Sequence, residues 1–219
     1  MGRADPATAA TVETKWVDEL EVDAPDIVGA WRGIEAGRFM TVRREVRRRA
    51  GAGSAAAIVT QLEATATAIT TLIETLPDPA FALPGGEADW TVAEAIGHDA
   101  AARAGLVIAG ALAASGRWPS DGARVVPSVP GPAGVGREDL IRKIGQSQRI
   151  IARSAKQIAG HETDPCPLDH PLVGRLSCGE WLLFAGIHDL MHLEQLHGIA
   201  ASLGRTATVP EPLAPGSVG

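Results

Sequence analysis

The chain has 219 residues, enough for one ordinary domain with a hydrophobic core; 45% of them are hydrophobic, only 4% are aromatic and none is tyrosine. Much of the apolar content is alanine, which favours helices and their close packing, so the composition indicates an all-α protein. The net charge of -6 gives no overall positive field for a phosphate backbone or an anionic membrane, which argues against nucleic acid and membranes as partners.

Two cysteines, Cys166 and Cys178, are too few for a disulfide framework and wrongly spaced for a CxxC redox pair. The N-terminal residues lack a basic start followed by an apolar run, and no stretch is expected to reach the length that spans a bilayer. A reducing, cytoplasmic location is therefore expected. Cys178 also begins a predicted helix, whose dipole can lower the pKa of a thiol.

Residues 1–53 are predicted to be an N-terminal accessory segment, because most of them show no clear helical period. A short amphipathic piece within it places five apolar residues on one face: Ile27, Trp31, Ile34, Val42 and Val46. The same segment contains a basic run at helical spacing, which favours a solvated face over a nucleic-acid contact: Arg43, Arg44, Arg47, Arg48 and Arg49.

Four amphipathic helices are predicted after this segment. The first covers 54–76, and its apolar face requires partner helices: Ile58, Leu62, Thr65, Ile69, Leu72 and Leu76. The third covers 137–159, with one face formed by Leu140, Ile144, Ser147, Ile151 and Ile158. The second (91–115) and the fourth (177–203) each begin with a T/S-x-x-E capping box. With long connections at 118–136 and before residue 177, this pattern predicts a four-helix bundle over 54–205 and a flexible tail at 206–219.

Three histidines form the candidate metal site. His188 and His192 are four residues apart on the fourth predicted helix, so both imidazoles project from one face. His98 lies in the middle of the second predicted helix among small residues, where a buried ring without a partner would be disfavoured. Three protein ligands leave a coordination position for water or substrate, so the set His98, His188 and His192 predicts a catalytic type of metal site.

Four neighbouring residues are candidates for the pocket or for supporting the ligands. HDLMH is similar to the HExxH motif of zinc proteases, but Asp189 is shorter than the glutamate base, so Asp189 either holds a ligand ring or meets solvent. Trp181 and Gln195 lie seven residues on either side of His188 and either line a pocket or serve the core, which is favoured for Trp181. Glu94 could be a fourth ligand or a base, although its capping box explains it. No other side chain is assigned a catalytic role.

The remaining histidines are left out of the site. His197 is turned about 140° from His192 on a helix, and His161 and His170 fall in predicted loops, although the loop of His170 could fold over the mouth of the bundle.

Two segments carry a family resemblance: WTVAEAIGHDAAAR and LSCGEWLLFAGIHDLMHLEQLHGI. Through them the chain resembles the DinB-like proteins, also called YfiT-like metal-dependent hydrolases, which adjoin the mycothiol-dependent maleylpyruvate isomerases. The resemblance covers about residues 54–203. It implies an up-down-down-up four-helix bundle in which His98, His188 and His192 hold a divalent metal, usually zinc or nickel.

The resemblance implies a metal-dependent enzyme that uses a low-molecular-weight thiol such as mycothiol. An S-transferase or isomerase acting on a small electrophile is the leading expectation. Two alternatives stay open: a hydrolase in which metal-bound water is the nucleophile, and a non-catalytic metal-binding stress or interaction protein. A homodimer is a further expectation.

Overall fold

The computed structural model of the chain describes residues 15–34, 39–50, 54–86, 89–122 and 124–207. These residues are mostly helical, and the expected all-α class is confirmed. The elements in chain order are α2 (Pro25–Arg32), α3 (Phe39–Ala50), α4 (Ala55–Thr75), the 3-10 helix η1 (Asp78–Ala82), α5 (Val92–Ala114), α6 (Arg137–Ile158), β1 (Pro165–His170), β2 (Gly174–Ser177) and α7 (Cys178–Ala207). Of the tail expected at 206–219, the first two residues belong to α7 and the rest lie outside the described residues.

The helix starts follow the predicted capping chemistry. Ser54 caps α4 by accepting a hydrogen bond from the backbone N–H of Ala57. At the start of α5, Thr91 accepts from the Glu94 N–H while the Glu94 carboxylate accepts from the Thr91 N–H. Ser177 and Glu180 make the same reciprocal pair at the start of α7. The four long helices predicted from the sequence therefore exist, with ends close to those expected.

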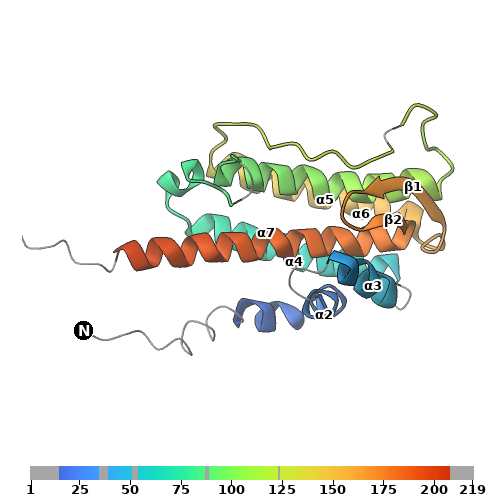
Figure 1. Cartoon of the computed structure of the whole chain (residues 1–219), viewed down its shortest axis with the longest axis horizontal. Coiled ribbons are helices and arrows are strands. Elements are labelled where there is room, and N and C mark those ends of the chain that lie inside the picture. The colour runs from blue at the N-terminus through green and yellow to red at the C-terminus, as the bar shows by residue number, and fades with distance from the viewer. Residues whose placement is uncertain (1–14, 35–38, 51–53, 87–88, 123, 208–219) are drawn as a thin grey trace, which may run out of the picture.

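The four long helices pack beside one another along most of their length (Figure 1). α5 packs against α6 and α7, and α4 packs against the same two helices. α4 and α7 run in one direction and α5 and α6 in the other, because the connection after α5 returns along the outside of that helix before α6 begins (Figure 1). The predicted apolar faces of α4 and α6 are buried between these helices.

α4 is, among the described helices, the one long and apolar enough by length and composition to cross a membrane. The expectation that no stretch reaches this length is therefore wrong. The apolar face of α4 packs against α6 and α7, as the face of a core helix does, so this is weak evidence for a membrane. The cytoplasmic location stays a prediction.

The N-terminal helices α2 and α3 pack against α7 and against each other. Ile27, Val28 and Val46 are fully buried in this contact. Of the arginines on α3, Arg44, Arg47 and Arg48 are exposed, as expected for a solvated face, whereas Arg43 and Arg49 are half-buried. These helices thus share the hydrophobic core of the longer ones, while the boundary expected at residue 53 stays a prediction.

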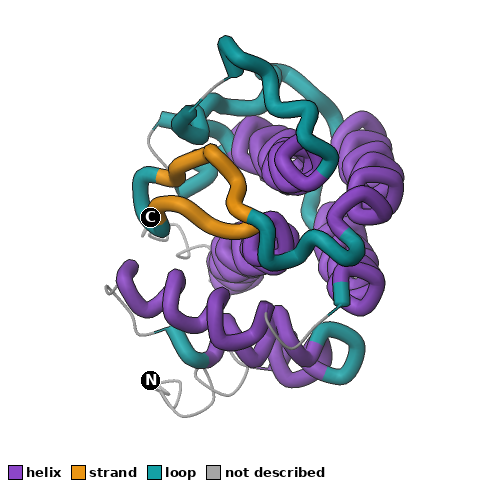
Figure 2. The backbone as a smooth tube through the Cα atoms, turned by 90° about the vertical axis from the view of Figure 1, so that its right-hand side faces the viewer, coloured by secondary structure: helices purple, strands orange, loops and turns teal. Residues whose placement is uncertain are grey.

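The segment before α7 was expected to be a loop and is instead an antiparallel hairpin. β1 pairs with β2, with Asp169 opposite Arg175 and His170 opposite Gly174. The hairpin lies beside the end of the bundle where α5 ends and α7 begins (Figures 1 and 2). It also anchors the connection between α5 and α6, because the Val126 N–H donates to the Asp169 carbonyl at 2.9 Å.

Candidate metal centre

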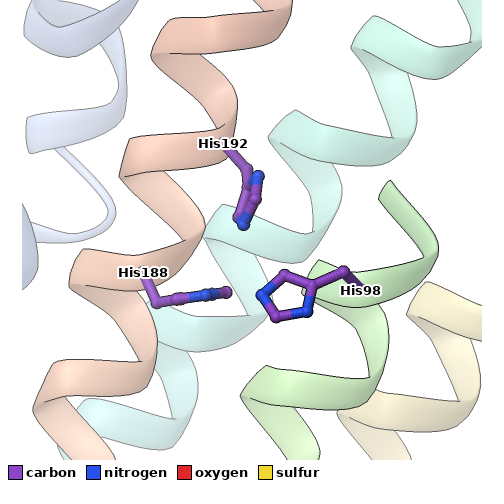
Figure 3. Close-up of side chains that lie close together, drawn as sticks. All are labelled: His98, His188 and His192. Atoms are coloured by element: carbon purple, nitrogen blue, oxygen red, sulfur yellow. The ribbon is translucent and has the colours of Figure 1, made fainter. Parts of the chain in front are cut away.

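The rings of His98, His188 and His192 converge between α5 and α7 (Figure 3). Their ring centroids are 5.3 Å apart for His98 and His188, 5.5 Å for His98 and His192, and 4.7 Å for His188 and His192. One ring nitrogen of each lies within 4.8 Å of the others. The three side chains that the sequence singled out therefore form a cluster that could hold a metal ion.

Each of the three rings is oriented by a separate acceptor at its Nδ1 atom. His98 Nδ1 lies 2.7 Å from the Val129 carbonyl oxygen, and His188 Nδ1 lies 3.1 Å from a carboxylate oxygen of Asp99. His192 Nδ1 lies 3.1 Å from Oε1 of Gln195. Oxygen acceptors at Nδ1 place the proton on that nitrogen, so Nε2 carries the lone pair that a metal would require.

A close approach of two backbones holds the partner of His98. Gly131 of the α5–α6 connection lies against Gly97, and a Cβ on Gly131 would be 2.6 Å from the Gly97 Cα. The Gly131 N–H donates to the Glu94 carbonyl at 2.9 Å, which fixes the connection on α5. This contact requires glycine at position 131 and leaves little room for a side chain at position 97, where a Cβ would lie 3.1 Å from the Gly131 Cα. It brings the Val129 carbonyl to the imidazole of His98.

Asp99 supports the candidate centre, and it was not among the residues predicted from the sequence. Its side chain is buried and its second carboxylate oxygen has no hydrogen-bond partner among the described residues. Burial alone would raise the pKa of Asp99, but the hydrogen bond from His188 and the positive charge of Arg103 lower it. An aspartate inside an alanine-rich buried helix, directly after a candidate ligand, was the signal in the sequence.

Asp189 was expected either to hold a ligand ring or to meet solvent, and it does neither. The carboxylate is fully buried and forms an ion pair with Arg103 at 2.9 Å, and the Thr65 hydroxyl donates to it. Arg103 in turn donates to Ser147 and to the Leu62 carbonyl. Burial raises the pKa of Asp189 despite this arginine. One oxygen of Asp189 also lies within 4.8 Å of ligand atoms of Asp99 and His188, a second group that could hold a metal ion.

The other supporting candidates occupy different places. Gln195 both accepts from His192 and donates to the Gly85 carbonyl, which ties α7 to the segment before α5. Glu94 is engaged by its capping box. Trp181 is fully buried in the core, which was the favoured interpretation of this residue.

A cleft of about 690 Å³ opens beside the histidine cluster, and His98, His188 and Gln195 contribute to its wall. A second wall comes from Trp31 on α2, from Ile34 just after α2 and from Val42 on α3. The rest of the lining is mainly apolar and comes from α5, the connection after it, the hairpin and α7: Ala102, Leu106, Val126, Pro127, Pro171, Leu172, Val173, Phe184, Ile187 and Met191. A small molecule in this cleft would lie next to the candidate metal centre.

His170 also lines this cleft, although the sequence analysis left it out. Its ring packs against Phe184, with centroids 5.0 Å apart. Burial lowers the pKa of His170 to about 4, so the ring is neutral near pH 7. His161 and His197 stay away from the site: His161 pairs with Asp164 at the surface and His197 stacks on Trp16.

The expected activation of Cys178 by the helix dipole is wrong. The thiol is buried, and burial together with Cys166 and Asp164 raises its pKa to about 12. Desolvation of the thiolate therefore outweighs the dipole at this helix start.

The donor set fits a transition metal, because three neutral imidazoles, each oriented at Nδ1, suit zinc, nickel, iron or copper. The fold and the site together define a helical protein with a candidate three-histidine metal centre beside a cleft. No protein-family model, curated protein or solved structure was found to match the chain.

Proposed function

We propose that this protein is a metal-dependent enzyme of the DinB-like type, with the up-down-down-up bundle of that family. In this proposal His98, His188 and His192 hold one divalent ion, zinc or nickel, and a small molecule binds in the adjoining cleft. The observation that carries the proposal is the convergence of three imidazoles from two helices, each with its Nδ1 atom bonded to a different oxygen acceptor. A buried histidine can be satisfied by a single hydrogen-bond partner, whereas three rings with nitrogens within 4.8 Å of one another favour a set of metal ligands.

The proposed chemistry is S-transfer or isomerisation with a low-molecular-weight thiol such as mycothiol acting on a small electrophile. The bound metal would supply Lewis acidity, which lowers the pKa of a coordinated thiol toward neutrality. The chain's own residues contribute the orientation of the three ligands and a mainly apolar cleft wall beside the site. The buried thiols Cys166 and Cys178 are not part of this cleft, so the thiol comes from a separate molecule.

Metal-assisted hydrolysis is the second candidate. Glu194 lines the same cleft, and a carboxylate near a metal-bound water is the kind of general base that hydrolysis employs. The two candidates differ in whether turnover requires a thiol.

The first experiment is elemental analysis of purified protein for wild type, His98→Ala and His161→Ala. We expect about one equivalent of zinc or nickel in wild type and in His161→Ala, because His161 is an exposed residue outside the cluster, and a large loss in His98→Ala. Absence of bound metal in the wild type, even after reconstitution, would rule out the metal-dependent enzyme and favour the non-catalytic interaction protein.

The second experiment separates thiol chemistry from hydrolysis. The protein is loaded with cobalt(II), and its visible spectrum is recorded with mycothiol, with N-acetylcysteine and with N-acetylserine, which has an alcohol in place of the thiol. A new charge-transfer band with the thiols alone is the expected result. No spectral response to any thiol, together with thiol-independent ester cleavage, would replace the S-transferase by the hydrolase.

A further inference from the structure

His170 reaches the cleft from a different direction than the three candidate ligands. It is the last residue of β1 and pairs with Gly174, whose φ of 68° allows the chain to reverse into β2. The ring packs against Phe184, which also lines the cleft, and lies 6.4 Å from the ring of the buried Trp181. The hairpin thus holds one additional imidazole in the wall of the cleft.

The hydrogen bonding of His170 is the reverse of that at the candidate ligands. The backbone N–H of Leu172 donates to His170 Nδ1 at 3.1 Å. A backbone N–H can only donate, so Nδ1 carries the lone pair and the proton of the neutral ring sits on Nε2. Among the described residues no acceptor is paired with this Nε2–H group. His170 therefore offers a neutral donor where the candidate ligands offer lone pairs.

The rest of the cleft wall determines which molecule such a donor would meet. Among the described residues that line it, there is no lysine or arginine, and Glu194 is the one carboxylate. The other polar side chains beside the histidines are Ser128, Gln195 and the indole of Trp31, and the amide of Gln195 is engaged with His192 and Gly85. The wall is otherwise apolar, which favours an apolar ligand with few polar atoms.

We propose that the cleft binds an apolar small molecule that carries a hydrogen-bond acceptor such as a carbonyl oxygen, and that Nε2–H of His170 donates to this acceptor. This proposal deepens the proposed function, because it assigns the substrate class of the same cleft. The role of His170 is to bind and orient the substrate, and its neutral ring holds the donated proton throughout.

The test compares two probes of similar shape, acetophenone and ethylbenzene, of which only acetophenone has an acceptor. Their affinities for metal-loaded protein are measured by ligand-observed NMR titration. The quantity of interest is the ratio of the two affinities, because the general hydrophobic contribution cancels when this ratio is compared between variants. For one neutral hydrogen bond, we expect the ratio to fall by about threefold to tenfold in His170→Phe.

Three matched variants identify the origin of any change. His170→Gln keeps an N–H donor and should retain the wild-type ratio, whereas His161→Phe changes an exposed histidine outside the cleft and should have no effect. His98→Ala removes a candidate metal ligand. A ratio that falls in His98→Ala and not in His170→Phe would show that the carbonyl binds the metal, which overturns the role of His170 and leaves the metal centre intact.

Other outcomes are equally decisive. If neither probe binds the wild type, or if the ratio is the same in wild type and His170→Phe, the proposal is wrong. If the wild type binds no metal even after reconstitution, a ratio that still depends on His170 would support the donor role while the proposed metal enzyme is ruled out. The tautomer is tested in the wild type by ¹⁵N NMR of the histidine rings, where a proton on Nδ1 of His170 instead of Nε2 would overturn the proposal without any variant.

Discussion

The Asp99 carboxylate on α5 lies 3.1 Å from Nδ1 of His188 on α7. Its sequence neighbour His98 contributes its own ring to the same cluster. Consecutive residues of one helix therefore serve the candidate centre in two ways, one as a ligand and the other as the acceptor that orients a ligand from the next helix.

Replacing Asp99 by Asn should weaken metal binding by about tenfold to a hundredfold, because the charge that fixes the His188 tautomer is lost while the side-chain size is kept. The affinity is measured by competition with a chelator of known strength. Asp164→Asn is the matched control, since Asp164 pairs with the exposed His161 in the same manner outside the centre. Equal affinities for wild type and Asp99→Asn would mean that Asp99 does not support the site.

Gly186→Ala should destabilise the protein by separating α2 from α7. A Cβ at this position would lie 2.4 Å from Cδ1 of Ile27, which is fully buried. We expect a loss of about 1–3 kcal/mol in the free energy of unfolding, measured by urea denaturation. Part of the loss should be recovered in the double variant with Ile27→Val, which removes the methyl group that is contacted.

The control for this prediction lies on the same helix. A Cβ on Gly198 meets no atom within 4 Å, so Gly198→Ala should keep or slightly raise the stability through its better helix propensity. Similar losses at both positions would contradict the packing of α2 on α7 described above.

Arg103→Met should cost about 3–5 kcal/mol in the free energy of unfolding, because it leaves the buried Asp189 carboxylate without its cationic partner. Guanidinium denaturation at neutral pH measures the loss. Arg117→Met, at an exposed arginine, should cost less than about 1 kcal/mol. If Arg103→Met with Asp189→Leu is no more stable than Arg103→Met alone, the unpaired carboxylate is not the cause.

The thiol of Cys178 should resist modification in the folded protein. With a pKa raised to about 12, only on the order of one thiol in ten thousand is ionised at pH 8. Ellman's reagent should therefore react slowly with native protein and release two equivalents per chain after unfolding, from Cys166 and Cys178. A rapid native reaction of one equivalent would contradict the burial of the thiols.

The same pKa shift predicts how stability depends on alkaline pH. The folded-state pKa of Cys178 lies above its ordinary value of 9.0, so the stabilising contribution is complete below about pH 9 and is lost as the pH rises through about 12. Urea midpoints of wild type and Cys178→Ala, measured at pH 7 and pH 10, should converge as the pH rises. A constant difference would show that the thiol does not titrate in this way.

The sequence by itself determined the helical class, the four long helices and the two capping boxes, because these depend on periodicity and on contacts between residues three or four apart. It also placed His188 and His192 on one helix face for the same local reason. His98 was chosen because a histidine among small residues in a helix needs a partner, and the structure brings it to the other two rings.

Only the tertiary structure decided which groups surround these histidines. The pairing of Asp99 with His188, of Asp189 with Arg103 and of His98 with the Val129 carbonyl joins residues that lie 31 to 89 positions apart. His170 entered the cleft because its segment forms a hairpin instead of the expected loop. Such contacts follow from how helices and loops pack against one another, and local spacing along the chain shows which face is buried but not which distant residue it will meet.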